Sequence, residues 1–149
     1  MIVKIIKGVW FLSLLTAIAV LLYSYASFPE DIQVREGAQM QTVTRNGFFY
    51  AILGLLAVFN SLVFVVTKIM GEQDPFFRIW FYGLVVLFNL FIVVSLQFFN
   101  LYNSAERFDY DRIGYIIYGS VGLILLWALL LPLKMILKKF SRKQIVIPD

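Results

Sequence analysis

The sequence contains no cysteine and no histidine, and only 15% of its 149 residues are charged. Without cysteine the chain can form neither a disulfide framework nor a thiolate nucleophile or thiolate metal ligand. Without histidine it has no imidazole for acid–base catalysis, metal binding or haem ligation. Soluble domains carry roughly 25% charged residues, so the low charge content also argues against a water-soluble protein.

Hydrophobic residues make up 61% of the chain and aromatic residues 17%, which excludes a disordered or low-complexity protein. Charged residues are absent from four long segments. These segments predict membrane spans at about 8–29, 46–67, 79–102 and 113–133. About 20 apolar residues in a helix cross a bilayer, and a helix satisfies its own backbone there. We therefore predict an all-α membrane protein, a single domain of four transmembrane helices in an up-down antiparallel bundle.

The distribution of positive charge predicts the orientation, because short loops rich in Lys and Arg stay in the cytoplasm. With both termini cytoplasmic, nine of the 13 basic residues lie inside: Lys4, Lys7, Lys68, Arg78, Lys134, Lys138, Lys139, Arg142 and Lys143. Six of the nine acidic residues lie outside. We expect Trp10, Trp80 and Trp127 to form a belt near the inner boundary.

The first span has one rival interpretation, a secretory signal peptide. The segment 1–7 is basic, and Ser24-Tyr25-Ala26 suits a small-residue cleavage site. The apolar stretch from Gly8 to Tyr25 nevertheless runs for 18 residues, longer than the 7–15 typical of such peptides. We therefore predict a membrane helix.

The connections between spans are short. In the inner turn, Gly71 suits the left-handed position after a helix, Asp74 suits an N-cap and Pro75 suits the first helical position. In the first outer loop, about 28–45, residues 32–34 and 40–44 resemble the two arms of a small hairpin. An isolated hairpin is marginally stable in water, so it must rest on the membrane, on the second outer loop (about 103–112) or on a partner.

The cytoplasmic tail, 134–149, places five cations within ten residues. We expect Lys138, Lys139, Arg142 and Lys143 to contact anionic lipid headgroups, at about 1 kcal/mol for each cation. The alternative is a stop-transfer anchor that only sets topology. Nucleic acid is not expected as a partner, because the chain has no basic domain to bind it.

The spans contain no ionisable residue apart from tyrosine, which argues against a pump, a proton-coupled carrier or a voltage sensor. The outer carboxylates, including Glu106, Asp109 and Asp111, are expected to be solvated loop charges, because catalytic or metal-binding carboxylates need a pocket or converging oxygens. No nucleophile elbow or phosphate loop is present. We predict a protein that is not an enzyme, with no cofactor and no metal.

Two asparagines, Asn60 and Asn89, are the deep polar residues of the spans. Counted from the inner ends of their helices, they differ in height by about 4–5 Å. We predict an interhelical amide contact between them, with a ligand site as the alternative. Small residues allow helices to pack closely. We predict internal packing for Ser13 with Ala17 and for Gly54 with Ala57. For the fourth span, packing within the chain and packing against another subunit both remain open.

The segment after the first span, Phe28-Pro29-Glu30-Asp31-Ile32-Gln33-Val34-Arg35 followed by Gly37, resembles a motif of SdpI-type bacterial membrane proteins. In that family Leu-Pro-x-x-Ile/Val-Pro-x-His follows the first span. Pro29, Ile32 and Val34 fit, whereas Gln33 and Arg35 replace a proline and a histidine. Tyr25-Ala26-Ser27-Phe28-Pro29 also resembles short four-helix membrane proteins of Bacteroidota. Both resemblances imply a bacterial cytoplasmic (inner) membrane protein.

Three functions remain open. The first is an accessory or scaffold subunit of a membrane complex, whose partner is another membrane protein or a second copy of the chain. The second is an immunity or sensing protein that binds a peptide or toxin at its outer face, and the third is a small-molecule transporter. For the partner-binding surface we single out five residues of the first outer loop: Pro29, Glu30, Ile32, Val34 and Arg35.

Overall fold

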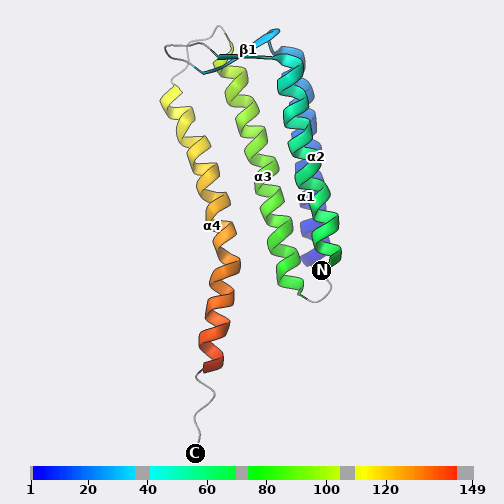
Figure 1. Cartoon of the computed structure of the whole chain (residues 1–149), viewed down its shortest axis with the longest axis vertical. Helices are drawn as coiled ribbons and strands as arrows, with labels where there is room; N and C mark the ends of the chain where they lie inside the picture. Colours follow the sequence, from blue (N-terminus) through cyan, green and yellow to red (C-terminus); the bar gives the residue numbers. More distant parts are fainter. Residues whose placement is uncertain (1, 36–40, 70–73, 105–109, 144–149) are drawn as a thin grey trace, which may run out of the picture.

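A computed structural model of the chain describes residues 2–35, 41–69, 74–104 and 110–143, with the side chains of 2–34, 41–69, 74–104 and 114–137 (Figure 1). It is mostly helical. The helices are α1 (Ile2–Ser27), α2 (Arg45–Ile69), α3 (Pro75–Tyr102) and α4 (Tyr110–Lys143). Helices α1, α2 and α3, and the part of α4 from Gly114 to Leu137, are each long and apolar enough to cross a membrane.

Local sequence signals explain where the helices begin and end. Asp74 caps α3, and its carboxylate accepts hydrogen bonds from the backbone N–H groups of Phe76 at 2.9 Å and Phe77 at 3.4 Å. Pro75 follows as the first helical residue, so the predicted start of this helix is confirmed. Gly71 lies outside the described residues. Helix α1 ends at Ser27, so Pro29, placed in the first span by its lack of charge, belongs instead to the connection that follows.

The first connection forms a two-stranded antiparallel hairpin of β1 (Asp31–Arg35) and β2 (Gln41–Thr44). Asp31 pairs with Thr44 and Gln33 pairs with Thr42, and the register shifts between Gln33 and Arg35. Helix α2 begins directly after β2. The predicted hairpin is thus present, and it lies at the end of the bundle where α1 ends and α2 begins (Figure 1). We call this the hairpin end and the opposite one the turn end.

Helix α3 is the central element of the bundle. It contacts α1, α2 and α4, and its most extensive packing is against α1. Figure 1 shows α4 beside α3, on the side away from α1 and α2. None of the residues of α4 from Gly114 to Leu137 is buried. The fold is therefore a three-helix core to which α4 is attached.

Two apolar clusters fill the three-helix core. The cluster nearer the hairpin consists of Ala17, Leu21, Phe28, Ile32, Leu56, Ile92 and Leu96. The cluster nearer the turn end consists of Trp10, Val63, Tyr82, Val85 and Val86. Because Phe28 and Ile32 come from the first connection, the hairpin is part of the core.

Two tryptophans join α4 to α3. The Trp80 indole donates to the Trp127 carbonyl at 2.8 Å, and the Trp127 indole donates to the Trp80 carbonyl at 2.8 Å. The Trp127 ring lies against Gly83. A Cβ atom added at Gly83 would lie 2.7 Å from the Cε2 atom of Trp127. Lys134 adds a cation–π contact, its Nζ atom 3.4 Å from the centre of the Phe76 ring. We call this set of contacts the tryptophan clasp.

The structure corrects two predictions about packing. Trp10 was expected at the membrane interface, but its indole lies inside the bundle and donates to Asn60. Ser13 and Ala17 are buried as expected. Gly54 and Ala57 are exposed, so the internal packing predicted for them is wrong.

Candidate functional site

A buried polar layer separates the two apolar clusters. Asn60 of α2 and Asn89 of α3 exchange hydrogen bonds, Nδ2 of Asn60 to Oδ1 of Asn89 at 2.9 Å and Nδ2 of Asn89 to Oδ1 of Asn60 at 3.1 Å. Asn89 also donates to the Ser13 hydroxyl at 3.0 Å. Trp10 donates to Asn60 at 2.8 Å. We call Trp10, Ser13, Asn60 and Asn89 the amide layer.

Every donor hydrogen of the amide layer has a partner. The second N–H of Asn60 donates to the Leu56 carbonyl at 2.8 Å, and the Ser13 hydroxyl donates to the Trp10 carbonyl at 2.7 Å. Asn89 is fully buried, and Asn60 is 5% exposed. A ligand at this position would have to break hydrogen bonds between α1, α2 and α3. The layer is built to join helices, and it offers no free donor to a transported molecule.

At the hairpin end, Asn103 fastens β1 to the end of α3. Its Oδ1 accepts from the Gln33 backbone N–H at 2.7 Å, and its Nδ2 donates to the Gln33 carbonyl at 3.2 Å. The same Nδ2 donates to the Phe99 carbonyl at 3.0 Å. The Asn103 side chain thus takes the place that a neighbouring strand would occupy along β1.

This contact shows which edge of the hairpin is open. In an antiparallel pair, both backbone groups of a residue point either toward the partner strand or away from it. Those of Gln33 point away from β2, because they bond to Asn103. Thr42, which faces Gln33, therefore directs its N–H and C=O to the outer edge of β2. All four residues of β2 are exposed, and no described segment pairs with this edge.

A second set of polar contacts joins α1 to α3 below the hairpin. Asn100 donates to the buried Ser24 hydroxyl at 2.9 Å and accepts from the Ser27 hydroxyl at 3.0 Å. These residues and Asn103 form an uncharged set of contacts that joins the hairpin end to α1 and α3. Their combined effect is to fix the height of β1 relative to the helices.

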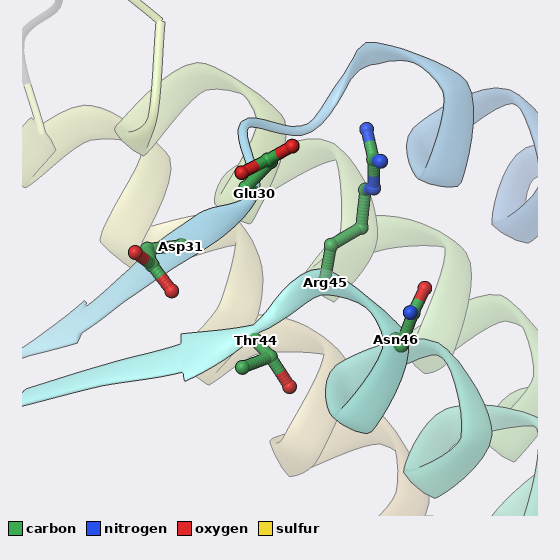
Figure 2. Close-up of a pocket in the computed structure, with 5 residues that line it drawn as sticks. All are labelled: Glu30, Asp31, Thr44, Arg45 and Asn46. Atoms are coloured by element: carbon green, nitrogen blue, oxygen red, sulfur yellow. The ribbon is translucent and has the colours of Figure 1, made fainter.

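Figure 2 shows a polar pocket of about 260 Å³ at the base of the hairpin, lined by Glu30, Asp31, Thr44, Arg45 and Asn46. Arg45 is committed to the fold: its Nη1 donates to the Phe28 carbonyl at 3.2 Å, and its guanidinium lies 5.1 Å from the centre of the Tyr25 ring. The carboxylates of Glu30 and Asp31 belong to exposed residues. The pocket lining therefore carries two carboxylates and one guanidinium, a net charge of −1, at the base of the strands.

The predicted surface residues of this loop divide into two groups. Pro29 and Glu30 are exposed. Ile32 is fully buried and Val34 packs against the same cluster, so the assignment of Ile32 to a partner-binding surface is wrong; this side chain anchors the hairpin. The side chain of Arg35 lies outside the described part of the structure. So do the side chains of Lys138, Lys139, Arg142 and Lys143, although α4 extends over these residues.

Sequence reasoning missed the amides that hold the hairpin. The signal that pointed to them is the spacing of Ser24 with Ser27 and of Asn100 with Asn103, because residues three apart lie on one face of a helix. Two such polar pairs at matching ends of neighbouring spans indicate a contact.

Comparison with known proteins gives no relative from which a site could be transferred. A scan against protein-family models finds no matching model, and searches of the curated proteins and of the solved structures find no match.

Proposed function

We propose that the chain is a non-enzymatic accessory or scaffold subunit of a bacterial cytoplasmic-membrane complex, and that it acts through its hairpin. The open edge of β2 at Thr42 is the observation that carries this proposal. An unpaired strand edge is a template for an added strand. The edge of β1 is occupied by Asn103, so a partner segment would add only on the β2 side.

The proposed orientation is an up-down bundle with both termini in the cytoplasm and the hairpin outside. The excess of Lys and Arg on the turn side supports it. The saturated amide layer supports a role that depends on surfaces, because it leaves no donor for a substrate passing through the core. The partner in this proposal is another membrane protein or a second copy.

We expect Thr42→Cys to react with a membrane-impermeant maleimide in intact cells, and Lys68→Cys to react only after permeabilisation. Both residues are exposed, at opposite ends of α2 and its hairpin. The chain has no native cysteine, so all label reports the introduced thiol. If Lys68→Cys is labelled in intact cells and Thr42→Cys is protected, the orientation is the opposite of the one proposed.

We expect Thr42→Pro to lose the partner and Thr42→Val to retain it. Proline removes the N–H that points to the open edge, whereas valine keeps it, and the ladder to β1 does not use this N–H. The measurement is recovery of the partner with the tagged chain from membranes solubilised in mild detergent. Equal recovery with both variants, or a lone monomer with the unaltered chain, would contradict a scaffold that acts through this edge.

The second candidate is an immunity or sensing protein, and the pocket of Figure 2 favours it. Glu30 and Asp31 lie beside the base of the strands, so a peptide bound along β2 could place a basic residue there. The resemblance to SdpI-type proteins in residues 28–35 points the same way. A partner that is removed when membranes are washed free of peripheral proteins would favour this candidate, whereas a scaffold partner would stay.

A further inference from the structure

One face of α3 carries five residues at alternating steps of three and four: Leu87, Leu90, Val94, Gln97 and Leu101. Such spacing keeps residues in one stripe along a helix. The first three line a cavity between α3 and α4, and the last two line a cavity at the hairpin end. The two cavities therefore follow each other along a single helix face, which we call the α3 stripe.

The cavity between the helices is apolar and has a volume of about 540 Å³. Its lining includes Leu87, Leu90 and Val94 of α3 and Ile116, Gly119 and Leu123 of α4. The Ser120 hydroxyl also borders it but donates to the Ile117 carbonyl at 2.7 Å. The groove thus offers no free donor, and only a hydrocarbon group matches it.

The cavity at the hairpin end has a mixed polar and apolar lining and a volume of about 310 Å³. Its polar lining consists of Tyr23, Ser27, Gln97, Asn100, Asn103 and Ser104, none of which is charged. Most of these side chains bond within the protein. The Gln97 amide and the Tyr23 hydroxyl have no hydrogen-bond partner among the described residues, and both residues are exposed.

The position of Gln97, inside α3 and not at its end, indicates that its unbonded amide has a partner outside the chain. Gln97 lies six residues before Asn103, about 9 Å along the helix axis, and is exposed on a helix that is long and apolar enough to cross a membrane. Moving an amide into an apolar medium without a hydrogen bond has a free-energy cost. A group from outside the chain that accepts a hydrogen bond would remove this cost.

We propose that the α3 stripe binds one diacyl membrane lipid of zwitterionic headgroup from the leaflet on the hairpin side. Its hydrocarbon chain fills the groove between α3 and α4, and its ester and phosphate oxygens accept hydrogen bonds from Gln97 and Tyr23. This inference does not depend on the proposed scaffold function, because the α3 stripe and the edge of β2 are separate surfaces.

The order of the two cavities along the stripe favours a lipid over a transmembrane helix as the occupant. A helix would leave the polar groups of the hairpin-end cavity without a partner, whereas a lipid has an apolar and a polar part in the same order as the stripe. The absence of charge among the described lining residues favours a headgroup without net charge.

The test is native mass spectrometry of the purified chain titrated with phosphatidylethanolamine and, separately, with phosphatidylglycerol. We expect one bound phosphatidylethanolamine. Gly119→Leu fills the groove and should lower the affinity by about tenfold or more, and Gln97→Leu should lower it by about fivefold, as for one lost hydrogen bond. Gly122→Leu lies on the same helix outside the groove and should leave it unchanged.

Circular dichroism would establish that all three variants remain folded. Unchanged lipid binding in Gly119→Leu would overturn the proposal, and so would equal loss in Gly122→Leu. A preference for phosphatidylglycerol would overturn the zwitterionic headgroup site. A dimer that Gly119→Leu abolishes would show that a second copy occupies the groove instead.

Discussion

Replacement of Asn89 by leucine is expected to destabilise the protein by about 3–5 kcal/mol. The substitution removes three hydrogen bonds, two to Asn60 and one to Ser13. In membrane bundles a bond of this kind contributes about 0.6 kcal/mol on average, and a buried polar group left without a partner adds about 1–3 kcal/mol. The measurement is unfolding in mixed micelles with increasing sodium dodecyl sulfate, followed by circular dichroism.

The double variant Asn60→Leu/Asn89→Leu should lose less than the sum of the two single variants, because removing the second amide also removes the unpaired group that the first substitution leaves. Ser61→Leu is the matched control: Ser61 follows Asn60 on α2 but is exposed, and its replacement should have little effect. Strict additivity of the two asparagine variants would contradict a coupled amide layer.

Gly83→Ala is expected to release α4 from α3. A Cβ atom at this position would lie 2.7 Å from Cε2 and 2.9 Å from Nε1 of Trp127, closer than packed atoms can approach, so the ring must move and the tryptophan clasp must open. Overpacking of this kind costs about 1–3 kcal/mol. Spin labels on exposed residues of α2 and α4, at Ser61→Cys and Leu130→Cys, should show a broadened distance distribution.

Gly54→Ala is the control for this experiment, because no atom lies within 4 Å of its Cβ position. It should leave the distances unchanged and raise helix stability by up to about 1 kcal/mol. Adding Trp127→Ala to Gly83→Ala removes the clash and with it the strain on the three-helix core. Helix α4 should nevertheless remain detached, because the tryptophan clasp is lost. A sharp, unshifted distance distribution in Gly83→Ala would show that the clasp does not position α4.

The number and placement of the helices could be predicted because charged residues are confined to their ends. The N-cap at Asp74 and the hairpin could also be predicted, since capping and strand pairing depend on local sequence. The packing of α4 against α3 could not be predicted. Its apolar surface looks like that of the other helices, and in lipid such a surface has no preference for protein over hydrocarbon. The contacts of the tryptophan clasp distinguish the face that packs.

Sequence reasoning brought Asn60 and Asn89 to similar heights, because rise along a helix is regular. It could not add Trp10, since a tryptophan near a span end is typical of the membrane interface and its inward rotation depends on the packing of α1 against α3. It placed Ile32 on the surface for a similar reason. A loop residue is usually solvated, and this one is buried by packing against residues of α1, α2 and α3 that are distant in the sequence.

The amide layer also determines how the helices can slide past one another. Apolar side chains in lipid are nearly interchangeable, so a bundle joined by them alone could shift lengthwise at little cost. A shift of one turn, about 5.4 Å, would separate Asn60 from Asn89 and break both hydrogen bonds between them. The layer therefore allows one alignment of α1, α2 and α3. Since the hairpin is fastened to the ends of these helices, a layer in the middle of the bundle sets how far the open edge of β2 projects above it.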